Sequence, residues 1–229
     1  DDIDFDENDQ LFFDDRLDLL ERTTSSITLE ANHHTFPITH TKIGAVFYDH
    51  EFHRVDLRDS DQSYIYVGAE REIAGRSMTG RIGYTTLDYQ DPDVEDYDGI
   101  LGDLALGFQI GNRNQLRLQY VRDVEFSIFQ NNTHYVTDRL FINDTHEIGS
   151  RLKLHIQAQG GVNSYLVPVS TPAGMIERED ELYFIGAGPS YRFFDRFELG
   201  FVIGPWERNS NIPGETADGI RWHVLLSFN

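Results

Sequence analysis

The sequence predicts an all-β chain that folds as an up-and-down antiparallel transmembrane β-barrel of about twelve strands. Three observations lead to this prediction. Apolar and polar residues alternate with a period of two from end to end, and helical periodicity is almost absent. Short and long connections alternate along the chain. The last predicted strand, which begins near residue 219, carries aromatic and aliphatic residues at every second position.

Composition limits the classes of protein that remain. The 229 residues include no cysteine, which excludes a disulfide scaffold, a thiolate zinc site and a catalytic thiol. With 39 acidic and 19 basic residues the formal charge is −20, so nucleic acid, whose phosphates need clustered lysine and arginine, is not an expected partner. No apolar stretch approaches the roughly 18 residues of a membrane helix, which excludes a helical membrane protein. Barrel strands need only about 9 to 11 residues and are half polar, so a β-barrel remains.

The alternation is clearest near the end of the chain. Trp222, Val224 and Leu226 fall on one face of the last run, and Arg221 and His223 fall on the other. About twelve such runs begin near residues 10, 26, 41, 62, 77, 99, 114, 134, 150, 181, 196 and 219. No linker or break in composition separates them, so residues 1–229 are predicted to form a single domain with an acidic N-terminal extension over residues 1–10.

The connections indicate which kind of barrel this is. Tight connections fall at 74–77, 111–114, 149–150 and 194–196, and long, mostly acidic ones at 54–61, 89–99, 129–134, 167–180 and 207–218. In an up-and-down topology alternate connections lie at the same end, so one end has tight turns and the other has acidic loops. Outer-membrane barrels have short periplasmic turns and long external loops, and a last strand with Phe228 next to the terminus resembles their recognition signal. The predicted location is therefore the bacterial outer membrane, in contact with its lipid and lipopolysaccharide.

Two segments resemble a known family. The first runs from Tyr66-Val67-Gly68-Ala69-Glu70-Arg71-Glu72-Ile73 through Gly83-Tyr84-Thr85-Thr86-Leu87-Asp88-Tyr89 to Gly99, and the second runs from Arg178-Glu179-Asp180-Glu181-Leu182-Tyr183 through Gly186-Ala187-Gly188-Pro189-Ser190-Tyr191 to Glu207-Arg208-Asn209-Ser210-Asn211. Both are similar to the β-barrel porins of bacterial exopolysaccharide operons. The resemblance implies a passive conduit or anchor in exopolysaccharide export, with acidic polysaccharide and export-machinery subunits as partners. It leaves open whether the chain is a compact relative or the C-terminal part of a larger barrel.

The polar face of the strands carries the residues proposed for function. If the apolar face points to lipid, the charged face lines the lumen. The predicted lumen or constriction residues are Arg81, Arg117, Lys153, Arg192, Arg221, Asp103 and Glu198. Two interpretations remain open: a basic-lined constriction that attracts anionic solute, and a network of ion pairs that holds the wall. No enzymatic activity and no cofactor are predicted.

Aromatic and histidine residues give two further hypotheses. Membrane-interface aromatic girdles are predicted to include Tyr84, Tyr89, Tyr183, Tyr191 and Trp222, with a core position as the alternative for any single tyrosine. The residues that could ligate a metal ion are Asp49, His50 and His53. Because His50 and His53 have opposite parity in a strand, they converge only if a loop or bulge reorients one of them, so no metal site is predicted.

Two other classes of protein fit parts of the pattern. One is a soluble or periplasmic β-barrel that holds a small ligand, with its apolar face inward. The other is a structural subunit of a surface assembly. The side of the wall that the apolar residues occupy decides between the membrane and the soluble barrel: packing of Leu106, Leu154 and Trp222 in an interior, with Arg117 and Lys153 turned outward, would overturn the membrane interpretation.

Overall fold

The computed structural model describes residues 20–36, 38–129, 132–171, 174–193 and 196–228. Eleven long strands make up the main sheet: β1 (Arg22–Phe36), β2 (Thr39–Phe52), β3 (Ser60–Ile73), β4 (Arg76–Tyr89), β5 (Tyr97–Ile110), β6 (Asn114–Phe129), β7 (Asn132–Glu147), β8 (Leu152–Tyr165), β11 (Glu179–Phe193), β12 (Phe197–Ser210) and β13 (Ala217–Phe228). A small hairpin, β9 (Val169–Thr171) and β10 (Gly174–Ile176), and the 3-10 turn η2 (Asp56–Arg58) lie in loops. These strands confirm eleven of the predicted runs. The run near residue 10 and the acidic extension lie outside the described residues.

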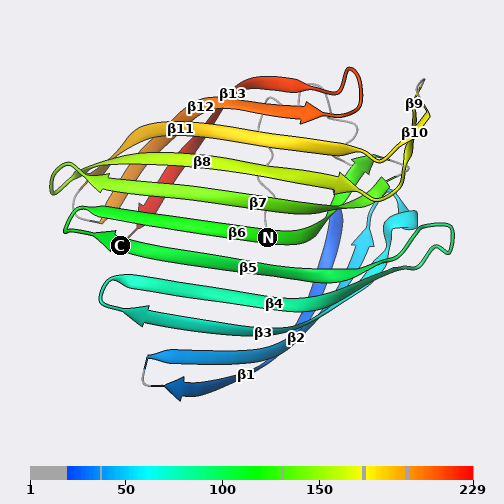
Figure 1. Cartoon of the computed structure of the whole chain (residues 1–229), viewed down its shortest axis with the longest axis horizontal. Coiled ribbons are helices and arrows are strands. Elements are labelled where there is room, and N and C mark those ends of the chain that lie inside the picture. Colours follow the sequence, from blue (N-terminus) through cyan, green and yellow to red (C-terminus); the bar gives the residue numbers. More distant parts are fainter. Residues whose placement is uncertain (1–19, 37, 130–131, 172–173, 194–195, 229) are drawn as a thin grey trace.

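The main sheet is an up-and-down meander. Each strand pairs antiparallel with its neighbour in the chain, and β8 pairs with β11 past the small hairpin. Figure 1 shows the sheet curling into an arc whose edges are β1 and β13. Because eleven strands alternate in direction, the two edge strands run the same way.

The tight turns lie at one end of the sheet and the long loops at the other, as predicted. The turn between β3 and β4 consists of Ala74 and Gly75, both at positive φ (46° and 76°), which matches the twist of a two-residue hairpin. One predicted long loop is wrong. Of the predicted loop 129–134, Phe129 and residues 132–134 belong instead to β6 and β7, because these strands, at 16 residues each, extend to Phe129 and resume at Asn132; residues 130 and 131 lie outside the described part of the chain.

The two faces of the sheet differ sharply. On one face, residues in register across five strands are Leu29, Ala45, Ile65, Tyr84 and Ile100, and Ile65 is 59% exposed. Apolar residues continue over this face to β13, and they are exposed rather than packed in an interior. Soluble monomers rarely expose contiguous apolar patches above a few hundred Å². The arrangement is the reverse of a soluble ligand-binding barrel.

The opposite, concave face carries the buried side chains. Val46, Tyr64, Tyr66, Leu87 and Leu101 form a cluster there. Trp222, by contrast, is 49% exposed on the apolar face, while Arg117 lies on the concave face, in register with Gly107 and Asn143. This is the sidedness that the membrane interpretation requires.

No helix in the described part of the chain has the length and apolar composition needed to cross a membrane.

Candidate functional site

The candidate site is the concave face of the main sheet. The strand registers place all seven predicted lumen residues on it. Arg81 of β4 lies opposite Asp103 of β5, and Arg192 of β11 lies opposite Glu198 of β12. Lys153 of β8 lies opposite Ser190, beside the same carboxylate. Arg117 and Arg221 lie on β6 and β13.

Ion pairs neutralise most of this charge. The Arg81 guanidinium forms an ion pair with the Asp103 carboxylate. Glu198, only 8% exposed, receives Lys153 Nζ at 2.7 Å and an Arg192 nitrogen at 3.5 Å on the same oxygen, Oε2. Three of the five predicted cations therefore have an acidic partner. This geometry favours the wall-holding interpretation for these residues, because a buried charge is retained only when it is paired.

The second oxygen of Glu198 anchors a smaller polar network. Ser190 Oγ donates to Glu198 Oε1 at 2.7 Å, and His155 Nε2 lies 2.8 Å from Ser190 Oγ. His155 Nδ1 lies 3.2 Å from Thr145 Oγ1. In a catalytic triad the carboxylate would instead hold the far nitrogen of the histidine. The arrangement therefore positions β7, β8, β11 and β12 against each other and does not activate a nucleophile.

The two remaining cations differ from each other. The Arg221 guanidinium lies 5.2 Å from the centre of the Trp206 ring, a cation–π distance. Arg117 is exposed and makes no ion pair or hydrogen bond within the described residues. On this part of the concave face Arg117 is the cation with charge available to a solute.

Polar amides surround Arg117, and the sequence analysis did not single them out. Gln115, Gln119, Asn143 and Gln157 share its face of β6, β7 and β8. Their shared parity with Arg117 was a signal available in the sequence. It was missed because only charged residues were considered for the lumen.

At the loop end, the tip of the β6–β7 hairpin leaves the sheet. We define the hairpin tip as residues 123–129 and 132–136. The β5–β6 ladder ends at the pair Gly102–Arg122, so beyond it β6 pairs only with β7. Phe126 in the tip contacts the rings of His50 and Phe52 on β2, at 5.0 and 4.9 Å between centroids. Three strands separate β2 from β6 in the sheet, which is about 19 Å at the usual strand spacing, so the tip must fold over the concave face.

Arg58 in η2 holds the hairpin tip. Its side chain is 2% exposed, and its guanidinium donates to the backbone carbonyl oxygens of Ser127 and, at 3.3 Å, Phe129. Burial lowers the pKa of Arg58 from its usual value, and the nearby Tyr89 opposes that shift. Arginine remains charged in proteins, so both bonds are charge-assisted.

Aromatic contacts fix the tip on both sides. His134 packs against the rings of Tyr89 and Tyr97, each at 5.6 Å, and its Nδ1 lies 3.0 Å from the Tyr89 hydroxyl. On the other side, Arg178 lies 4.1 Å from the centre of the Phe129 ring. The tip therefore spans the concave side from β1 and β2 to the loop before β11 and narrows the loop end.

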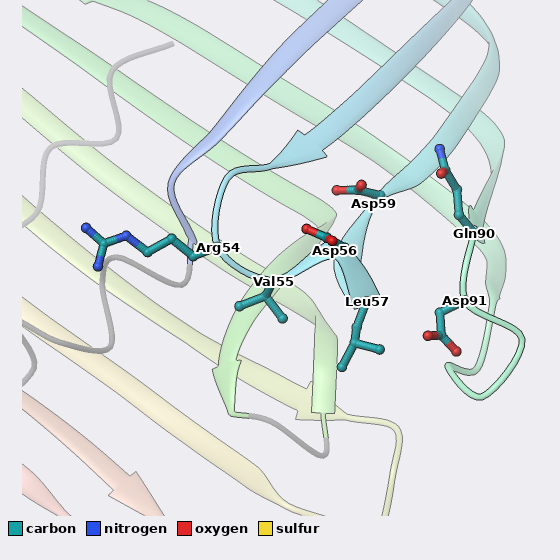
Figure 2. Close-up of a pocket in the computed structure, with 7 residues that line it drawn as sticks. All are labelled: Arg54, Val55, Asp56, Leu57, Asp59, Gln90 and Asp91. Atoms are coloured by element: carbon teal, nitrogen blue, oxygen red, sulfur yellow. The ribbon is translucent and has the colours of Figure 1, made fainter.

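Figure 2 shows the loop that carries Arg58. Val55 and Leu57 point to the same side of the loop, and Arg54 points away from them. These residues line a hollow of about 540 Å³ between the β2–β3 and β4–β5 loops. Two of its three carboxylates are engaged locally: Asp59 accepts the Phe52 N–H at 2.7 Å, and Asp91 accepts the Asp93 N–H at 2.9 Å.

Four of the five predicted interface aromatics lie on the apolar face. Tyr84, Tyr183, Tyr191 and Trp222 are 40 to 50% exposed there, so a girdle role stays a prediction for them. Tyr89 is the exception, and its assignment to the membrane interface is wrong. It is 8% exposed on the concave face, because the hairpin tip covers it.

The candidate metal ligands do not converge. His50 is buried on the concave face, with Nδ1 3.0 Å from Thr24 Oγ1 and Nε2 3.3 Å from Gln62 Oε1. Asp49 has the opposite parity, and His53 lies past the end of β2 with Nε2 2.9 Å from Thr23 Oγ1. Within the described ranges no group of three or more metal-ligating side chains is present.

Solved structures resemble this fold. The FrpB iron transporter from Neisseria meningitidis matches in its F3-3 variant, with TM-score 0.61 and 9% identity over 90% of this chain and 40% of that chain. Its F5-1 variant matches with TM-score 0.61 and 9% identity, and the F5-1 apoprotein form with TM-score 0.62 and 10% identity, each over 90% of this chain and 41% of that chain. The chain therefore spans about two fifths of the length of these transporters. The likeness shows a shared barrel-wall fold.

Sequence comparison gives the family. No curated protein matches the chain. Residues 22–226, which cover the main sheet except the last two residues of β13, match the family described as "Putative beta-barrel porin 2". The chain belongs to this family of β-barrel porins.

Proposed function

We propose that the chain forms the wall of a bacterial outer-membrane conduit along whose concave face polar, anionic solute passes. The observation that carries the proposal is the sidedness of the sheet. Its apolar face is exposed, with Ile65 at 59% and Ile185 at 60%, and its charged and amide side chains lie on the concave face. Such a sheet is stable where lipid covers one face and water the other. Membership of a porin family supports the same function.

The solute that we propose is an acidic polysaccharide, and the other partners are export-machinery subunits. This proposal rests on the resemblance to barrels of exopolysaccharide operons, and the uncompensated charge of Arg117 among amides supports it. Outer-membrane lipid would contact the apolar face, and lipopolysaccharide would surround the acidic loops. FrpB is described as an iron transporter, but the amide-rich concave face of this chain favours a polar organic solute instead.

An anchor is the second candidate, and the hairpin tip favours it. Because the tip crosses the concave side and is held by Arg58, the loop end is narrowed. A barrel whose mouth stays closed would fix other export subunits in the membrane without passing solute.

Conductance in a planar bilayer tests the conduit. We expect ion channels whose reversal potential in a KCl gradient shows a preference for anions. Arg117→Glu should reverse or abolish this preference, because Arg117 is uncompensated, whereas Lys153→Gln should change it less, because Lys153 is already paired with Glu198. Cation preference in the native protein, or an equal effect of the two substitutions, would contradict the proposal. A stoichiometric complex with other subunits that shows no conductance would favour the anchor or a structural subunit.

A further inference from the structure

A hollow of about 510 Å³ lies at the tight-turn end of the concave face, over β3 to β7. The β3–β4 and β5–β6 turns lie at this end of the sheet (Figure 1). The side chains that matter for the argument are Thr79, Gln115, Arg117, Asn143 and Thr145. The volume falls in the range of about 300 to 1,000 Å³ that small-molecule sites occupy.

Small residues form the floor of this hollow. Gly107 lies opposite Ser77 on one side and opposite Arg117 on the other. A methyl group at Gly107 would reach the Ser77 hydroxyl, which would have to rotate away, so the glycine leaves the floor open at this point. The sheet backbone can thus be approached closely beside the Arg117 side chain.

The hollow differs from other parts of the concave face in that its Arg117 has no acidic partner in the described part of the chain. Elsewhere on the concave face, Lys42 pairs with Glu70 at 2.5 Å and Arg139 pairs with Glu125 at 3.0 Å. Arg117 has no acidic partner among the described residues, although it lines the hollow. Glu72 lines it too, in the same row across the concave face as Ser77, Gly107 and Arg117.

The polar side chains match a particular ligand chemistry. Amides and hydroxyls both donate and accept hydrogen bonds, as a polyhydroxylated solute requires, and guanidinium groups bind carboxylates bidentately. We propose that the hollow is a binding subsite for a carboxylated sugar unit, with Arg117 holding the carboxylate and Asn143 and Gln115 holding hydroxyls. The proposal rests on the proposed conduit for anionic solute, and it adds a defined place at which the solute pauses.

Titration calorimetry of the detergent-solubilised protein tests the subsite, with trigalacturonate as the acidic probe and maltotriose as the neutral one. We expect trigalacturonate to bind at least tenfold more tightly than maltotriose, because charge-assisted hydrogen bonds of about 1.5 to 3 kcal/mol correspond to roughly 10- to 150-fold. Arg117→Gln should remove this difference. Arg113→Gln is the matched control, since Arg113 lies in the adjacent β5–β6 turn, exposed and outside the hollow, and it should leave both affinities within twofold.

The outcomes separate this inference from the proposed function. Native protein that conducts anions but binds both sugars equally would overturn the subsite and leave the conduit intact. Equal losses in Arg117→Gln and Arg113→Gln would also overturn it. Heat-modifiable gel mobility of each variant confirms that it is folded. Asn143→Leu keeps the charge of the hollow and should weaken the binding of both sugars to the same extent. Protein that binds trigalacturonate selectively but never conducts would refute the conduit and retain the subsite.

Discussion

The hairpin tip is expected to detach when Arg58 is replaced by methionine. The substitution keeps an unbranched apolar stem but removes the guanidinium and its hydrogen bonds to the carbonyl oxygens of Ser127 and Phe129. A hydrogen bond from a charged group contributes about 1.5 to 3 kcal/mol, and relief of the desolvation cost of a buried guanidinium offsets part of that. A net loss of about 1 to 3 kcal/mol makes opening of the tip roughly 5- to 150-fold more frequent.

Hydrogen exchange followed by mass spectrometry measures this opening. Amides of the hairpin tip, such as those of Val124 and Phe126, should exchange faster in Arg58→Met by that factor, while amides in the centre of β8 should not change. Arg54→Met is the control, because Arg54 lies in the same loop with its side chain 56% exposed. Unchanged protection of the tip in Arg58→Met, or equal acceleration in both variants, would refute the assignment of Arg58 as the residue that holds the tip.

Three other substitutions test the two faces of the wall. Glu198→Gln should lower the free energy of unfolding in detergent by about 2 to 4 kcal/mol, because it leaves Lys153 without the carboxylate that pairs with it. Denaturant titration followed by tryptophan fluorescence measures this free energy, and an unchanged value would contradict the prediction. Ile185→Arg should lower the stability of the folded protein by about 2 to 4 kcal/mol, because the residue faces lipid, whereas Gln157→Arg on the concave face should lower it much less. Heat-modifiable gel mobility after refolding in vesicles measures the folded yield of each variant. Equal yields of the two variants would contradict this prediction.

The fold was predictable because its signal is local. Period-two alternation depends only on neighbouring residues, and it placed Trp222 and Arg117 on opposite faces without any knowledge of the partner strands. The sorting of tight turns and long loops to opposite ends is likewise readable along the chain. The alternation and the order of the connections can both be seen in the sequence of one chain.

The pairing of charges was not predictable, because it depends on register. Lys153 and Arg192 meet on Glu198 only because β8, β11 and β12 align at Ser190, and nothing in the alternation sets that alignment. A row of basic residues in the sequence thus became mostly an ion-pair network, with Arg117 left as the uncompensated cation.

The hairpin tip was missed for a different reason. Residues 129–134 have the polarity of a loop, but Phe126 just before them and His134 at their end are held by contacts with residues far away in the chain. The same long-range contacts bury Tyr89, which the sequence placed at the membrane interface. An isolated 3-10 turn carrying Arg58 gives no sign in the sequence that it reaches Ser127.

The central claim is that the apolar face meets lipid and the charged face meets water, and the two native tryptophans test it directly. Trp222 is exposed on the apolar face, and Trp206 lies on the concave face beside Arg221. Trp206→Phe and Trp222→Phe each leave one fluorophore, and each variant is reconstituted in vesicles of brominated phosphatidylcholine. We predict strong quenching of Trp222 by the bromine atoms and little quenching of Trp206. Equal quenching of the two, or stronger quenching of Trp206, would contradict the account.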